Sequence, residues 1–230
     1  MQKKFKNIIK WAAVAGCIPL TVFFPHVFGR RGYYLAAFFF ALLALGSVLA
    51  SFEKSQPGTL KISVIAVMCA LAVAGRMVFA GVPFVKPVAA FVIITGAMLG
   101  GQAGFLCGAV SMLISNFMFS QGPWTVWQML AFGIMGLLSG FVFHKRSRLK
   151  KTWIMALFGF FCYVAVTGPI LDLSGIFAYT MGGKQSLAGT LIAGLPVNLT
   201  AAVATAVFLF ILAKPIMKKL DRIIIKYGLD

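Results

Sequence analysis

The sequence predicts an all-α integral membrane protein of about eight transmembrane helices, with both termini in the cytoplasm. Hydrophobic residues make up 61% of the chain and charged residues only 11%, and the mean hydropathy is +0.97. A soluble domain needs a largely polar surface, so a chain this apolar must have lipid as its main solvent. At roughly 20 residues for each helical span, 230 residues accommodate about six to eight spans.

The net charge of +17 would suit nucleic acid, but the basic residues do not form a patch interleaved with polar sequence. They cluster at the ends of apolar runs, which is typical of cytoplasmic anchoring to anionic lipid head groups. We therefore expect membrane lipid, and no nucleic acid, among the partners of this chain.

Eight apolar segments can be drawn, and the fourth and fifth are short for a membrane span. A polar linker from Ser51 to Thr59, with Pro57-Gly58, separates the first two segments from the other six. We predict an N-terminal transmembrane hairpin (1–52), a six-helix core (60–215) and a basic cytoplasmic tail (216–230). The segments are Ile8 to Phe28, Tyr34 to Ser51, Leu60 to Ala80, Pro87 to Gly100, Ala103 to Phe119, Pro123 to Phe143, Thr152 to Leu171 and Leu187 to Ala213.

The basic residues between these segments set the orientation. With the N-terminus inside, the outer side receives only Arg30, Arg31, Lys86 and Lys184. The inner side receives the remaining basic clusters, as the positive-inside rule requires. We read the basic, apolar N-terminus as a retained first helix, because no clear cleavage site follows it. The expected location is a bacterial plasma membrane.

Residues that carry enzyme chemistry are scarce. The only carboxylates are Glu53, Asp172, Asp221 and Asp230, and three of them fall in predicted inner loops or the tail. The two histidines are expected near opposite membrane faces, so they cannot share a metal ion. A phosphate-binding loop of the P-loop type is absent from the sequence. We predict that the chain is not an enzyme, holds no metal or cofactor and does not itself hydrolyse ATP.

Two charged residues are expected near the outer half of the bilayer. Arg76 lies one to two turns from the outer end of its span, and an arginine in hydrocarbon is costly unless it is paired or reaches the head groups. Asp172 lies at the outer end of the seventh segment. Arg76 either lines a ligand site or snorkels to the outer lipid head groups. An ion pair with Asp172, as structural glue or as part of a ligand site, is one arrangement that this placement allows.

The run SNFMFSQGPWTVWQM, from Ser115 to Met129, is the most informative part of the sequence. Trp124, Trp127 and Gln128 recur at helical spacing, so the two rings and the amide can face one cavity. An aromatic belt at the membrane surface is the alternative. Together with Asn116 and Gln121, however, the pattern favours a lining that stacks on a flat polar ligand and hydrogen-bonds to it.

Two further patterns concern a loop and the helix surfaces. The loop from Gly81 to Pro87, which contains Phe84, is either a lid over the site or a plain connector. Small residues recur every four positions, and such stripes let helices approach closely in lipid, either within the fold or against a partner subunit. The stripes are Ala66, Ala70 and Ala74 in the third segment and Gly96, Gly100, Gly104 and Gly108 in the next two.

These features together resemble the substrate-binding S components of energy-coupling factor (ECF) transporters. The resemblance covers about residues 60 to 215 and is carried by the alanine stripe, the loop after it, the run GxxxGFxxG from Gly100 to Gly108, and the Gln121 to Met129 run. The last run is most similar to cobalamin-type S components. It differs from them at Ser120, where glycine is commoner, and at Val126, where proline is expected.

The resemblance implies a six-helix protein that captures a vitamin at the outer face, with cobalamin or a related corrinoid as the transported ligand and not as a cofactor. It also implies as partners a transmembrane coupling subunit, docked on Ala66, Ala70 and Ala74, and two ATPase subunits. The alternatives are another vitamin or a queuosine-type precursor, or a proton-coupled secondary transporter. The implied substrate-binding residues are Arg76, Phe84, Asn116, Gln121, Trp124, Trp127, Gln128, Asp172 and Asn198.

Overall fold

The structure is a computed structural model and describes residues 43, 46, 58–122, 124–179 and 187–228. The chain divides into two compact units, Met1–Ala44 and Leu45–Asp230. The predicted hairpin (1–52) lies outside the described residues apart from two positions, so the fold below is that of the second unit.

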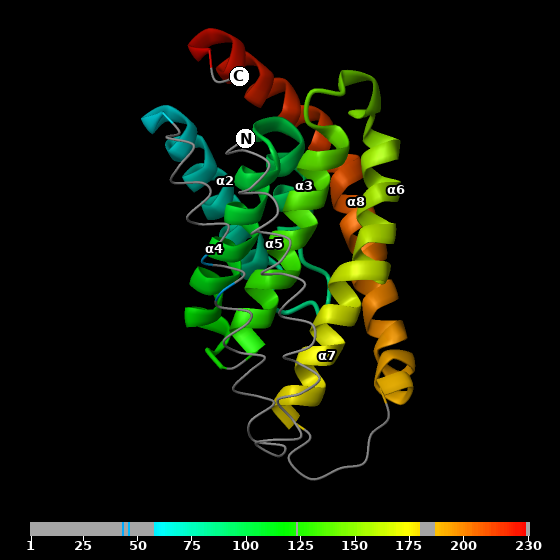
Figure 1. The fold of residues 1–230 in the computed structure, drawn as a ribbon. Coiled ribbons are helices and arrows are strands. Elements are labelled where there is room, and N and C mark those ends of the chain that lie inside the picture. Colours follow the sequence, from blue (N-terminus) through cyan, green and yellow to red (C-terminus); the bar gives the residue numbers. More distant parts are fainter. Residues whose placement is uncertain (1–42, 44–45, 47–57, 123, 180–186, 229–230) are drawn as a thin grey trace, which may run out of the picture. The chain divides into compact units, whose positions relative to one another are not determined.

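Every regular element in the described ranges is helical (Figure 1). A direct junction at Gly100 joins the second and third of these helices. The elements are α2 (Thr59–Val78), α3 (Val88–Leu99), α4 (Gly101–Phe119), α5 (Trp124–Phe143), the short 3-10 helix η1 (Ser147–Leu149), α6 (Thr152–Cys162), the π-helical segment η2 (Tyr163–Thr167), α7 (Gly168–Tyr179) and α8 (Leu187–Tyr227).

Five helical segments of the described residues are long and apolar enough to cross a membrane. They are α2, α4, α5, the run Thr152–Asp172 through α6, η2 and the start of α7, and Ala188–Tyr227 of α8. The predicted class, an all-helical multi-pass membrane protein, is confirmed. The total of eight spans and the side on which the termini lie stay predictions, because the first two segments are outside the described residues.

Helix α3 is the centre of the unit. All twelve of its residues are buried, and it contacts α2, α4, α5, α6 and α8. At 1.5 Å rise per residue it is about 18 Å long, too short to cross a hydrocarbon core of about 30 Å. The sequence predicted this shortness, and the contacts explain it, since a helix enclosed on all sides by protein does not need to reach either membrane surface. The same prediction for the fifth segment was wrong, because α4 has 19 residues and is long enough to cross.

The predicted glycine stripe packs inside the fold. A Cβ built on Gly104 would lie 2.5 Å from the carbonyl oxygen of Gly136 and 2.6 Å from the Cα of Gly96, so the backbones of α3, α4 and α5 are in direct contact. Gly108 meets the carbonyl of Phe132 on α5 in the same way. Small residues permit such an approach in lipid, where packing and not the hydrophobic effect holds helices together. Gly100 differs in its role, since its φ of +97° makes the turn between α3 and α4.

The last two predicted segments are longer in the structure than expected. The segment from Thr152 continues beyond Leu171 to Tyr179, with the π-helical stretch Tyr163–Thr167 in its middle. Pro169 lies just after this stretch; it has no N–H and its ring clashes with a regular helical turn before it, which accounts for the π geometry. Helix α8 runs on to Tyr227, so most of the predicted tail (216–230) continues a helix that was expected to end at Ala213.

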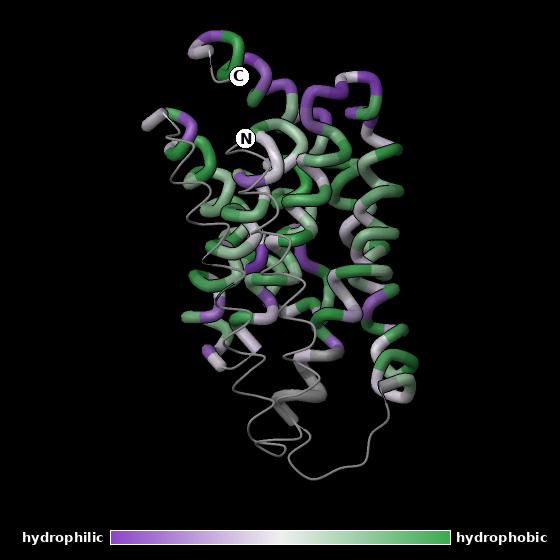
Figure 2. The backbone as a smooth tube through the Cα atoms, in the orientation of Figure 1, coloured by the Kyte–Doolittle hydropathy of each residue, from purple (hydrophilic) through white to green (hydrophobic). Residues whose placement is uncertain are grey.

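Hydrophilic residues gather at one end of this unit, drawn at the top of Figure 2, where α2 begins, α5 gives way to α6, and α8 ends. We call this the basic end; its cations include Lys61, Lys145, Arg146, Lys150 and Lys218. The opposite end carries the α2–α3 loop and the α4–α5 loop. Helices with cations clustered at one end match the predicted asymmetry between the two membrane faces.

The α4–α5 turn contains a strained residue. Ser120, the residue after α4, has a φ of +89° and a ψ of 127°. Residues with a Cβ rarely adopt positive φ, whereas glycine does so without steric penalty. This backbone conformation gives a physical reason why glycine is commoner at this position in the S components that the sequence resembles.

Replacing Gly104 with alanine should destabilise the fold by about 2 kcal/mol or more. The alanine Cβ would overlap backbone atoms of two neighbouring helices, and backbone atoms, unlike a side chain, cannot change rotamer to make room. Thermal unfolding in detergent measures the effect. The matched control is Gly81→Ala, since a Cβ on Gly81 meets nothing within 4 Å. Equal melting temperatures for the two variants would contradict the close packing of α3, α4 and α5.

Replacing Ser120 with glycine should stabilise the protein by about 1 kcal/mol. The change removes the steric cost of positive φ, which exceeds the opposing cost of the greater conformational entropy that glycine has in the unfolded chain. The variant Ser120→Ala keeps the Cβ and should not gain stability. Thermal unfolding of both variants against the parent chain checks this, and a gain of equal size in the alanine variant would count against strain at this turn.

Candidate ligand site

Arg76 is the starting point of a polar network at the end opposite the basic end. It lies in the last turn of α2, and its Nη1 donates hydrogen bonds to Ser115 Oγ and, at 2.9 Å, to Asn116 Oδ1, both on α4. The same nitrogen lies 3.5 Å from Met112 Sδ. Ser115 and Asn116 are fully buried. These contacts hold the charged side chain of Arg76 against the protein, so its guanidinium is not left without hydrogen-bond partners in lipid.

Asn116 carries the network onward to α5. Its Nδ2 donates to Gln128 Oε1 at 2.7 Å and to Thr125 Oγ1 at 3.0 Å. The Thr125 hydroxyl in turn donates to Gln121 Oε1 at 2.9 Å. The structure therefore joins four residues that the sequence singled out, Arg76, Asn116, Gln121 and Gln128, into one hydrogen-bonded chain across α2, α4 and α5. Interlinked polar groups of this kind fix one another's orientation.

The two predicted tryptophans lie beside this network on α5. The indole of Trp124 packs over Gly122, where an added Cβ would meet the ring at about 2.5 Å. Trp127 is one turn further along the helix and is half-buried. Both lie on one helix, as the sequence predicted, and residues three positions apart lie on the same side of a helix. Whether they line a ligand cavity stays a prediction.

The loop between α2 and α3 is held in a defined conformation. Lys86 Nζ donates to the carbonyl oxygens of Phe79, Ala80 and, at 2.9 Å, Val82, which ties the loop to the end of α2. Phe84 has a φ of +61° and is half-exposed. An aromatic residue at positive φ is a genuine outlier, and such outliers tend to occur at binding sites and clamps.

A second aromatic contact joins the loop to the network. The ring of Phe119 on α4 has the Arg76 guanidinium 4.8 Å and the Lys86 ammonium 6.0 Å from its centroid. Both separations are within the range of a cation–π interaction. Burial, followed by the nearby charge of Arg76, lowers the pKa of Lys86 below its usual value. Phe119 therefore offers its ring to two like charges, one from α2 and one from the α2–α3 loop.

Asp172 and Asn198 form a separate pair. Asn198 Nδ2 donates to Asp172 Oδ2 at 2.7 Å, which links α7 to α8. The carboxylate lies directly against Gly194, and Asn198 lies against Gly168. The ion pair between Arg76 and Asp172, which the sequence allowed, is not formed among the described residues, because Arg76 faces α4 and its partners are the buried oxygens of Ser115 and Asn116.

Sequence reasoning missed Tyr163. Its ring packs edge-on against Phe132 with 6.3 Å between centroids, and it lies within electrostatic reach of both Arg76 and Asp172. It stands at the start of the π-helical segment. The signal in the sequence was Gly168-Pro169, which predicts an irregular helix but does not reveal which side chain the irregularity presents. Ser115 and Thr125 were also missed as individual contributors.

The alanine stripe differs from the glycine stripe, because it is exposed. Ala66, Ala70 and Ala74 are all exposed in the described unit. They line a groove of about 570 Å³ between α2 and α4, whose other walls include Ile65, Leu106, Val110 and Ile114. The stripe is thus not used to pack against another described helix. That it docks a coupling subunit stays a prediction.

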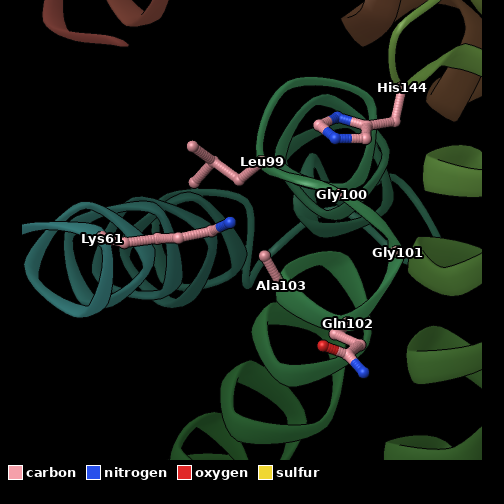
Figure 3. Close-up of a pocket in the computed structure, with 7 residues that line it drawn as sticks. All are labelled: Lys61, Leu99, Gly100, Gly101, Gln102, Ala103 and His144. Atoms are coloured by element: carbon pink, nitrogen blue, oxygen red, sulfur yellow. The ribbon is translucent and has the colours of Figure 1, made fainter. Parts of the chain in front are cut away.

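A small pocket lies at the basic end (Figure 3). In this view the imidazole of His144 lies near the Gly100 turn, and Lys61 extends from α2 toward the same turn. Burial, followed by the charges of Lys150, Lys61 and Lys145, lowers the pKa of His144. The pocket has a volume of about 260 Å³, and it lies at the other end of the unit from the Arg76 network.

Comparison with known proteins locates the chain among transport proteins. The model of the family described as "ECF-type riboflavin transporter, S component" matches residues 58–221. Two relatives, each named "UPF0397 protein", come from Lactococcus lactis subsp. cremoris strains NZ9000 and MG1363, and each is 29% identical over 119 residues. The match covers 49% of this chain and 65% of each relative. No solved structure matches.

The family match begins at the start of α2 and ends within α8, so it spans all the described helices that build the polar network. The family is one of transporter components and is not an enzyme family, in line with the lack of catalytic residues in the sequence. The expectation drawn from the alanine stripe and the Gln121 to Met129 run is confirmed at the level of the family. The chain belongs to the S components of ECF-type transporters.

Proposed function

We propose that this chain captures a vitamin at the outer face of a bacterial plasma membrane and delivers it for ATP-driven uptake by an ECF importer. Membership of the S-component family supports the general role. The observation that carries the proposal is the hydrogen-bonded chain from Arg76 through the buried Asn116 to Gln128, a set of polar groups fixed at the end away from the basic end. By the positive-inside rule that end faces outward.

The network supports ligand binding through its remaining donors. A guanidinium has five N–H donors, and within the described part of the chain the bonds of Arg76 start from Nη1. Its Nη2 and Nε are left for a bound ligand. Trp124 and Trp127 supply stacking surfaces for a flat ring system, and the loop with Phe84 covers the site as a lid. We assign the Asp172–Asn198 pair to the α7–α8 side of the same site, because Tyr163 lies within electrostatic reach of both Asp172 and Arg76.

Two vitamins are the leading candidates for the ligand. Riboflavin is favoured by the description of the matching family, and its flat isoalloxazine suits stacking between indoles. Cobalamin or a related corrinoid is favoured by the Gln121 to Met129 run, which is most similar to cobalamin-type S components. Both are coloured, so either can be identified by its absorption spectrum if it co-purifies with the protein.

The partners we propose are a transmembrane coupling subunit and two ATPase subunits. The groove along Ala66, Ala70 and Ala74 is the docking surface for the coupling subunit, because it is apolar, exposed and long enough to receive a helix. Small side chains there allow a partner helix to approach closely. In this arrangement the ATPase subunits, which are separate chains, provide the nucleotide-binding site that this sequence lacks.

Replacing Arg76 with glutamine should weaken vitamin binding tenfold or more, since a hydrogen bond from a charged donor contributes about 1.5 to 3 kcal/mol. Isothermal titration calorimetry with riboflavin and with cobalamin measures the dissociation constants. Arg148→Gln, at the basic end, is the control and should bind as the parent chain does. Thermal unfolding of each variant separates lost binding from lost folding, and Trp127→Leu tests the site without touching its charge.

A parent chain that binds neither vitamin, nor any other member of a vitamin and queuosine-precursor screen, would remove the main support for the proposal. Uptake that continues without the ATPase subunits but stops with an uncoupler would instead support a proton-driven carrier.

Replacing Ala70 with tryptophan should abolish association with the coupling subunit and leave vitamin binding intact, because the indole would fill the groove. Val67→Trp is the matched control: Val67 is exposed on the same helix and does not line the groove. Co-purification with the coupling subunit, after co-expression, measures association. Equal losses for both tryptophan variants, or unimpaired association for Ala70→Trp, would contradict docking at this groove.

A further inference from the structure

A second hollow at the basic end points to a function separate from vitamin capture. It has a volume of about 700 Å³ and lies between the start of α6 and the C-terminal part of α8. Five cations line it, two from the residues before α6 and three from α8, against a single carboxylate, Asp221. The five are Lys150, Lys151, Lys214, Lys218 and Arg222.

The cations of α8 are aligned by the helix. Lys214, Lys218 and Arg222 follow one another at intervals of four residues, so they form one exposed row. The same stretch is anchored, because Leu220 and Ile224 are buried in the hydrophobic core, and Met217, which lines the hollow, is buried as well. The row is therefore held in place on a rigid helix. Within the described part of the chain none of the five cations forms an ion pair with a carboxylate.

Apolar side chains continue the hollow toward the membrane interior. Trp153, in the first turn of α6, and Phe210, one turn before Lys214 on α8, both line it and are 57% and 65% exposed. One helical turn is a rise of about 5.4 Å. Both helices therefore change from apolar to basic within a turn, α6 between Trp153 and Lys151 and α8 between Phe210 and Lys214. Tryptophan is enriched at the membrane–water interface, which identifies this level.

The start of α6 adds partial positive charge. Its N-cap residue, Lys151, lies at the edge of the hollow, and its side chain makes no capping hydrogen bond to the first N–H groups of α6. A helix N-terminus favours negative charge and phosphate in particular. Figure 2 shows hydrophilic positions both just before α6 and along the end of α8.

From this combination we infer that the hollow is a binding site for an anionic phospholipid of the inner leaflet. The phosphate lies among the cations of α8 and the start of α6, and the acyl chains lie along Trp153 and Phe210. A soluble anion would use the cations but not the exposed apolar floor. An acidic protein segment would bind the cations alone. It would not require two walls that both change from apolar to basic at the level of the membrane surface. The lipid fastens the long C-terminal helix to the membrane plane.

The test measures lipid-dependent stability of the purified full chain in detergent. Phosphatidylglycerol should raise the melting temperature of the parent chain more than phosphatidylcholine does. The double variant Lys214→Gln/Lys218→Gln should need tenfold or more phosphatidylglycerol for half of the effect. Lys219→Gln/Lys226→Gln is the matched control, with the same charge change on the same helix outside the hollow, and it should respond within about twofold of the parent.

Three results would overturn the inference. Equal losses in the two double variants would mean that diffuse surface charge, and not a site, attracts the lipid. Inorganic phosphate that reproduces the stabilisation without acyl chains would identify a soluble anion as the occupant. Loss of coupling-subunit association in Lys214→Gln/Lys218→Gln with an unchanged phosphatidylglycerol response would identify a protein contact. If that variant fails to fold, Lys150→Gln/Lys151→Gln tests the α6 wall of the same hollow, and vitamin binding by the parent chain plays no part in any outcome.

Discussion

The close approach of three backbones, those of α3, α4 and α5, is the constraint on which the rest of this structure depends. In lipid no hydrophobic effect drives helices together, so contact area between backbones must hold them. Glycines at positions 96, 104 and 136 leave no space for a Cβ, and α3 is enclosed as a consequence. The same contact fixes the ends of α4 and α5, which carry Asn116 and Gln128, and so allows the hydrogen bond between these two side chains.

Polar groups in this protein are divided between two tasks at opposite ends. The Arg76 network is interlinked around the buried side chains of Asn116 and Thr125, and each side chain is oriented by the next. The cations of the basic end are mostly exposed and unpaired within the described residues. Burial makes polar groups selective because their geometry is fixed, whereas exposed cations suit a partner with dispersed negative charge, such as a lipid surface.

The two stripes of small residues illustrate how the same pattern acquires different roles. Both have a spacing of four, and in sequence each suits either internal packing or docking. The glycines face neighbouring backbones, while Ala66, Ala70 and Ala74 remain exposed along an apolar groove. The difference depends on which side of each helix the neighbours occupy. The exposed alanine stripe leaves one side of α2 open for the coupling subunit that we propose as its partner.

Composition and periodicity by themselves determined the membrane class, the starts of the six described segments, the shortness of α3 and the polar residues near one end, because hydropathy and helical spacing are local properties of the chain. Only the tertiary structure decided that Arg76 turns to Ser115 and Asn116 and not to Asp172, that Tyr163 lies within electrostatic reach of both Arg76 and Asp172, and that α8 continues through its basic part. Such choices depend on which helices become neighbours, and that is set by the fit of glycine-lined backbones far apart in the sequence.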